Sequence, residues 1–162
     1  MSMPTFIRYN TFVILIIATM VLAANGKRSD QKELAIHHFM QGEFLLNQGN
    51  YALAVLEFQD ALDIDPNAST IHISIADAYR RLGRSKHAED HLRISIDLDP
   101  EELSSREMLG HLYLINRRYD EAEKEFLVLS ELDTSNDNYI TVLGDLATVS
   151  YTHLTLPTNR EV

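Results

Sequence analysis

A pattern that recurs every 34 residues constrains this chain more than any other feature of its sequence. Three segments align without gaps at this spacing: residues 48–66, 82–100 and 116–134. Residues of the same kind fall in step within them: Gly49 and Gly83; Ala54, Ala88 and Ala122; Phe58, Leu92 and Phe126; Asp65, Asp99 and Asp133. A repeat of this length is one supersecondary unit that cannot bury its apolar face alone, so the units are expected to stack into an array.

Each repeat contains two segments whose apolar residues recur at helical spacing. Between residues 69 and 82, for example, Ile71, Ile75 and Tyr79 fall on one face of a helix. Pro66 and Pro100 end the helices before them, because proline lacks an amide hydrogen and disfavours helix in the preceding residue. The sequence therefore predicts helices at about 33–47, 51–64, 68–82, 85–98, 102–116 and 119–132, and a last helix from about 137 to about Ala147.

The period, together with the Gly-x-x-Tyr sequence at Gly110–Tyr113, resembles the tetratricopeptide repeat family. The resemblance covers roughly residues 35–148 and implies an all-α fold, a right-handed superhelical solenoid of helix-turn-helix repeats. The repeats it implies are 35–68, 69–102, 103–136 and a partial fourth repeat, 137–148. Residues 27–34 then form a linker and the start of the first helix.

The first 26 residues have the layout of a secretory signal. Arg8 precedes the uncharged run Thr11–Ala24, and small residues follow that run. A helix that crosses a bilayer needs about 20 apolar residues, more than this run contains. We therefore expect a signal peptide in residues 1–26, with an uncleaved membrane anchor as the alternative. Either one predicts an exported protein, periplasmic or secreted, or tethered to the membrane only through this segment.

The C-terminal residues depart from the repeat pattern. Residues 149–158 match the translation of a transposase adapter used in shotgun sequencing libraries, and residues 159–162 fit the sample index and the codon before the stop that follow it. We therefore expect residues 149–162 to be a non-biological tail, and the natural protein to continue past Thr148.

Composition excludes several classes of function. The formal net charge of −10 at pH 7 argues against nucleic acid as a partner, since phosphate binding needs a basic surface. The chain has no cysteine, which excludes disulfides and thiolate metal sites. His87 and His91 lie four residues apart on one helix face, but Ala88 stands where a zinc-protease motif would have glutamate. With no catalytic motif either, we expect no enzyme activity, cofactor or metal.

The family resemblance also implies a concave groove, lined by the first helix of each repeat, that binds a peptide segment. Its residues in this chain are expected to be Phe39, Glu43, Leu46, Ile73, Asp77, Arg80, Glu107, His111, Leu114 and Asp145. Four of them are carboxylates in one row, so the expected ligand carries basic and apolar residues. One subfamily grips a C-terminal carboxylate with paired Lys and Asn, but the corresponding residues here are Phe39, Glu43, Ser74 and Glu107. A solvated inner face without any ligand is the alternative.

Taken together, the sequence predicts an exported scaffold that binds a segment of a partner protein in its groove, in a setting such as envelope assembly. The alternative is that the repeats are the targeting arm of a larger enzyme whose catalytic domain lies beyond Thr148.

Overall fold

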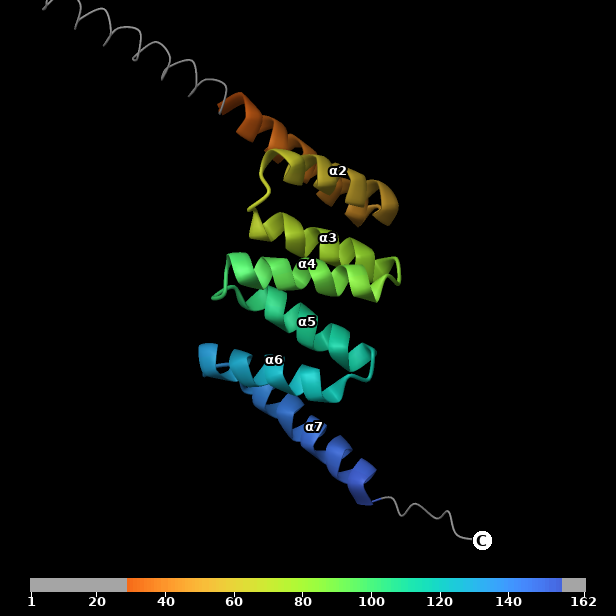
Figure 1. Ribbon diagram of the computed structural model, residues 1–162, viewed down its shortest axis with the longest axis vertical. Helices are drawn as coiled ribbons and strands as arrows, with labels where there is room; N and C mark the ends of the chain where they lie inside the picture. The colour runs from red at the N-terminus through yellow and green to blue at the C-terminus, as the bar shows by residue number, and fades with distance from the viewer. Residues whose placement is uncertain (1–28, 156–162) are drawn as a thin grey trace, which may run out of the picture.

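The computed structural model describes residues 29–155, and their side chains as far as residue 149, as one stack of antiparallel helix pairs (Figure 1). This part of the chain contains seven helices and no strands, which confirms the all-α solenoid. The first helix occupies residues 29–47 and is followed by α2 (Tyr51–Ile64), α3 (Ser69–Arg81), α4 (Ser85–Leu98), α5 (Leu103–Ile115), α6 (Tyr119–Leu132) and α7 (Asp137–Thr155).

The last helix is longer than the sequence predicted. It was expected to end near Ala147, but α7 runs on to Thr155. Residues 148–155 contain neither glycine nor proline, and Pro157 is the first residue beyond them that disfavours helix. The expected end of the last helix was therefore wrong, because local sequence allows the helix to continue.

Two predicted segments reach beyond the described residues. The expected signal or anchor, residues 1–26, lies wholly outside them, as do residues 156–162 of the expected tail. Within the described part of the chain, no helix is both long and apolar enough to cross a bilayer.

Each helix pair closes around one large apolar side chain on its second helix. Phe58 on α2, Leu92 on α4 and Phe126 on α6 are all completely buried. Small residues let the helices approach one another closely around these side chains. The completely buried alanines are Ala54, Ala61, Ala76, Ala78, Ala88 and Ala122.

The closest approaches occur at glycines on the first helix of a pair. A Cβ atom built on Gly42 would lie 2.5 Å from the ring of Phe58, and one on Gly110 would lie 2.9 Å from the ring of Phe126. In the second repeat the equivalent positions hold Ala76 and the smaller Leu92. Where the second helix carries phenylalanine, the first helix therefore has glycine in place of alanine. The combined volume of the two facing side chains stays nearly constant from repeat to repeat.

The turn inside each pair repeats the same backbone geometry. Gly49 and Gly83 have φ angles of 81° and 72°, in the left-handed region that glycine adopts without strain. The third copy holds Arg117, with a φ of 58°. In all three turns the next amide donates to the carbonyl five residues back, as Arg118 does to Tyr113 at 2.9 Å, which closes the helix end.

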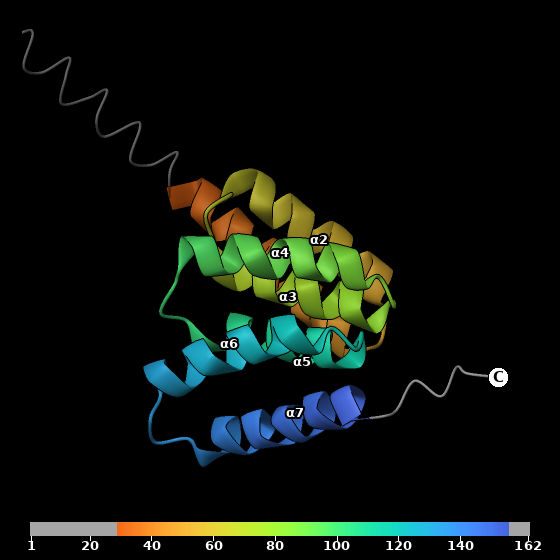
Figure 2. The same ribbon diagram turned by 60° about the horizontal axis from the view of Figure 1, so that its bottom comes forward.

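The first helices of the repeats lie on the inside of the stack. α3 contacts α5 directly, whereas among the described residues the second helices α2, α4 and α6 make no contact with one another. The stack therefore curves with α3 and α5 on its inner side. Figure 2 shows α7 beside the α5–α6 pair at the C-terminal end, where α7 packs on α6.

Candidate functional site

The inner face is the surface that the first helices of successive repeats share. It carries the groove residues predicted from the sequence, except Leu46, together with their neighbours, and α3 and α5 form its centre. We define the inner face by these residues: Ile36, Phe39, Glu43, Ile73, Asp77, Arg80, Arg81, Ser104, Glu107, Met108, His111, Leu114, Ile115 and Asp145.

A hollow of about 380 Å³ opens on this face between α3 and α5. Its wall on the α3 side is Arg80, and Met108 and Ile115 supply its apolar surface. Ile115 is 66% exposed, so it offers a ligand most of its apolar surface. Ser104, Glu107 and His111 complete the lining, with the His111 ring 3.9 Å from the Glu107 carboxylate.

A second and larger hollow, of about 640 Å³, lies where the first helix and α3 diverge. Ala35, Ile36 and Phe39 line it from the first helix, and Thr70 and Ile71 line it from α3. Each of the two complete junctions between repeats thus offers a hollow with apolar walls. This is the shape that an extended or helical segment with spaced apolar anchors would fill.

The four carboxylates of the predicted row have different environments. Asp77 is bound by two guanidinium groups: Arg81 Nε donates to it at 2.8 Å, and Arg80 forms an ion pair with its other oxygen. Hydrogen bonds to Asp77 and to Tyr51 raise the pKa of Arg81. The middle of the row therefore carries a net positive charge.

The rest of the row keeps its negative charge. Glu43 accepts a hydrogen bond from the Ser74 hydroxyl at 2.6 Å, which leaves its charge uncompensated. Glu107 forms no ion pair with a lysine or arginine among the described residues and has the His111 ring 3.9 Å away, and Asp145 is exposed. The inner face therefore alternates in sign along its length and is not uniformly acidic.

Three of the predicted apolar groove residues belong partly to the core. Leu46 is only 8% exposed and lies in the central apolar cluster, so its side chain offers a ligand little surface. Phe39 is half-buried against Phe58, with ring centroids 5.9 Å apart, and Leu114 is also half-buried against the core. The sequence did not single out Met108 as a groove residue, although it lies one helical turn after Ser104 and so on the same face.

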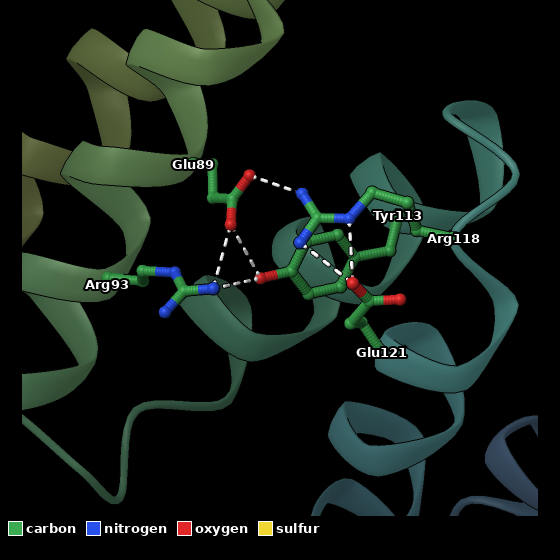
Figure 3. A network of polar contacts seen from close by, with 5 residues as sticks. All are labelled: Glu89, Arg93, Tyr113, Arg118 and Glu121. Carbon is green, nitrogen blue, oxygen red and sulfur yellow. Dashed lines mark hydrogen bonds and ion pairs between the residues drawn. The ribbon is translucent and has the colours of Figure 1, made fainter.

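A polar network on the opposite side of α5 ties the second repeat to the third (Figure 3). Glu89 on α4 accepts from Arg118 at 2.6 Å, from Arg93 at 2.8 Å and from the Tyr113 hydroxyl at 3.0 Å. Arg118 also bonds Glu121 and lies over the Tyr113 ring, 4.4 Å from its centroid.

The network determines the charge state of Glu89. Burial alone would raise the pKa of Glu89, but the hydrogen bonds from Arg118, Arg93 and Tyr113 outweigh it and hold the pKa below its usual range. Because every member is bound to another member, we assign this network a structural role.

The histidines that lie four residues apart on α4 do not converge on a common site. His91 is hydrogen-bonded to His72, with the two Nδ1 atoms 3.0 Å apart, and its ring stacks on Tyr79. The His87 ring also lies against the Tyr79 ring, with centroids 5.0 Å apart. Burial lowers the pKa of His72, and burial followed by the charge of His72 lowers the pKa of His91 to about 4. Both paired rings are therefore neutral at pH 7.

The comparison with protein families agrees with the repeat period and the helix pairs. A family profile described as tetratricopeptide repeat matches residues 22–69 and 73–136, which is more than half of the chain. The chain belongs to the tetratricopeptide repeat family. Its repeats are also similar in sequence to segments of longer proteins. One is the protein O-mannosyl-transferase F38B6.6 of Caenorhabditis elegans, 33% identical over 76 residues, and another is DnaJ homolog subfamily C member 3 of Bos taurus, 34% identical over 89 residues.

Those alignments cover 47% and 55% of this chain, but only 11% of the transferase and 18% of the DnaJ homolog.

Solved structures share the fold. The first tetratricopeptide repeat domain of Spaghetti (RPAP3), bound to the HSP90 peptide SRMEEVD, superposes with a TM-score of 0.68 at 21% identity over 74% of this chain and 95% of its own. The Yersinia enterocolitica type III secretion chaperone SycD, in complex with a peptide of the translocator YopD, has a TM-score of 0.66 at 15% identity over 70% and 92%.

Proposed function

We propose that this protein is a non-catalytic scaffold whose inner face binds a peptide segment of a partner protein. The observation that carries the proposal is the hollow between α3 and α5, where the exposed Ile115 and the neighbouring Met108 lie beside charged groups. Peptide complexes of the similar structures support it, since both bind peptides on the same fold. A ligand that covers Ile115 and Met108 would remove their apolar surface from water, which favours binding.

The ligand we propose carries lysine or arginine beside spaced apolar residues. Glu43, Glu107 and Asp145 provide the attraction for its basic residues, whereas Asp77 is already neutralised by its two arginines. Charge attraction of this kind mainly raises the association rate, and apolar anchors mainly lower the dissociation rate. Ile115 and Met108 are the anchor surface in the smaller hollow, and Ile36 and Phe39 in the larger one.

A peptide library panned against the purified chain tests this proposal. We expect enrichment of peptides with basic residues next to large apolar ones. Glu107→Gln should slow their association and flatten its salt dependence, and Ile115→Ala should speed their dissociation about tenfold or more. Glu123→Gln, a change of the same kind at an exposed position on α6 away from the inner face, is the matched control. Binding indifferent to both inner-face variants would exclude this surface as the ligand site.

We further propose that the protein is exported, with envelope assembly as its setting. What supports export is the uncharged run Thr11–Ala24 preceded by Arg8. The test is a fusion of residues 1–34 to a reporter that is active only outside the cytoplasm. An inactive reporter would exclude export, and the N-terminal sequence of the purified protein would distinguish cleavage from anchoring.

The second candidate function is that the repeats are the targeting arm of a larger enzyme. One relative similar in sequence is a transferase, and the segment that matches this chain makes up 11% of its length. Under either candidate, we propose that residues 149–162 are translated adapter. Amplifying the source DNA across codon 148 tests both ideas. A natural sequence that diverges from the adapter at codon 149 is expected, and a catalytic domain after it would favour the second candidate over a scaffold alone.

A further inference from the structure

We propose that His38, Glu57 and Asp60 form a binding site for a divalent metal ion of the zinc type, at the junction of the first helix and α2. The proposal does not depend on the inner face or on its ligand. We call these three residues the His38 cluster. Their ligand atoms all lie within 4.8 Å of one another, and within the described residues no other group of three or more metal-ligating side chains does so.

The geometry of the His38 cluster is close to that of a zinc site. His38 Nδ1 lies 2.8 Å from Glu57 Oε2 and 4.0 Å from Asp60 Oδ2. Two ligands at about 2.0 Å from a tetrahedral zinc ion are about 3.3 Å apart, between these two values. Small side-chain rotations would equalise the distances, and Asp60, whose side chain is 60% exposed, is free to make the larger one.

The donor set selects the class of metal. One imidazole nitrogen and two carboxylate oxygens suit zinc, cobalt or nickel, whereas magnesium and calcium prefer oxygen ligands alone. Glu57 and Asp60 lie three residues apart on α2, so both point to the same side of that helix. No lysine or arginine in the described part of the chain forms an ion pair with either carboxylate, so their combined charge is left for a cation.

The core packing beneath the His38 cluster holds its two helices in place. His38 and Glu57 each directly precede one member of the ring pair Phe39–Phe58, whose centroids are 5.9 Å apart. Gly42, one turn further along, allows the same close contact with the Phe58 ring. The ligands therefore stand on rigid helices whose separation is already fixed, so a metal would need little rearrangement.

Binding would link the first helix to α2 at the end of the array, where the first helix has no preceding repeat on its other side among the described residues. A metal that binds the folded state and not the unfolded chain raises the melting temperature, and the rise grows with the logarithm of the free metal concentration once that concentration exceeds the dissociation constant. The alternative is a plain hydrogen bond between His38 and Glu57, which gives Asp60 no role and predicts no effect of metal.

The experiment uses the full chain, stripped of metal with a chelator and dialysed. Zinc chloride is titrated by calorimetry, and cobalt chloride by visible absorption, which reports tetrahedral coordination. We expect one ion per chain and a melting temperature raised by several degrees in excess zinc. His38→Ala and Asp60→Asn should each weaken binding about tenfold or more. Asp60 is exposed and its amide is nearly isosteric, so Asp60→Asn keeps the test valid if His38→Ala fails to fold.

Two control variants locate the site. His111→Ala removes a histidine that has one carboxylate neighbour, Glu107, instead of two, and His91→Ala removes one member of the buried histidine pair. Both should leave zinc affinity unchanged. Loss of binding in His91→Ala with binding kept in His38→Ala and Asp60→Asn would overturn the proposal. So would the absence of saturable binding below about 1 mM zinc.

Discussion

Replacing Gly110 by alanine tests whether glycine is present on the first helix to admit the phenylalanine of the second. The added Cβ would lie 2.9, 3.2 and 3.3 Å from three atoms of the Phe126 ring. Phe126 is completely buried, so its ring cannot move without displacing other core side chains. Overpacking of this kind costs about 1 to 3 kcal/mol, and the better helix propensity of alanine returns about 1 kcal/mol. We expect Gly110→Ala to lower the free energy of unfolding by about 1 kcal/mol.

Gly144 is the matched control for this substitution. It occupies the equivalent position in the fourth repeat, and a Cβ there would meet no atom within 4 Å. Only the propensity gain then remains, so Gly144→Ala should stabilise by up to about 1 kcal/mol. The two identical substitutions are thus predicted to have opposite signs.

A compensating change strengthens the test. Phe126→Leu alone should cost about 1 to 2 kcal/mol through the cavity it leaves. Combined with Gly110→Ala, it recreates the Ala76 and Leu92 combination of the second repeat, so the double variant should be more stable than the sum of the single effects by about 1 kcal/mol. Urea unfolding of the parent protein, the three single variants and the double variant gives each change in the free energy of unfolding and the coupling between Gly110→Ala and Phe126→Leu. Equal gains from Gly110→Ala and Gly144→Ala, or additivity within about 0.5 kcal/mol, would refute the steric reasoning.

Three further predictions concern the turns, the histidine pair and the polar network. Arg117→Gly should raise the free energy of unfolding by about 1 kcal/mol, because Arg117 has a φ of 58° that glycine adopts without strain. An unchanged midpoint in urea would show that this backbone conformation does not strain the arginine. The pKa of His91 is lowered from 6.5 to about 4, so the fold keeps its full stability above pH 6.5 and loses part of it as the pH falls toward 4, because the unfolded chain then binds a proton that the folded chain does not. His91→Gln should flatten the melting temperature between those pH values, and an unchanged slope would contradict the assignment. Glu89→Gln should cost about 1 to 3 kcal/mol, since it leaves Arg118 and Arg93 without their shared carboxylate, and a loss below about 0.5 kcal/mol in thermal or urea unfolding would show that the network contributes little.

The second helices of the repeats could be predicted from the sequence to the residue. The structure has α2, α4 and α6 at the predicted 51–64, 85–98 and 119–132. Each of them follows a turn closed by a left-handed residue and ends shortly before Pro66, Pro100 or the equivalent Thr134, so local chemistry marks both ends. The end of α7 was missed because no such signal stands at residue 148.

The candidate site could be predicted only in outline. Periodicity places Glu107 and His111 on the inner face, but it does not show how deeply a side chain is buried, and so Leu46 was expected in the groove although it belongs to the core. The neutralisation of Asp77 also escaped prediction. It depends on the side-chain conformations of Arg80 and Arg81, which sequence spacing allows but does not require.

The polar network around Glu89 gives the junctions of the solenoid different kinds of contact. At the junction of the second and third repeats, Glu89, Arg93, Tyr113, Arg118 and Glu121 connect α4, α5 and α6 with charged hydrogen bonds. Across the first junction, the polar contacts among the described residues include the bond from Ser74 to Glu43 and the stacking of Arg81 on Tyr51 at 5.6 Å. The two junctions therefore differ in kind: charged hydrogen bonds join the second and third repeats, whereas α2 and α3 are held across the first mainly by packing. Salt screens the charged contacts and leaves apolar packing in place, so a segment bound along the inner face would span one salt-sensitive junction and one that is not.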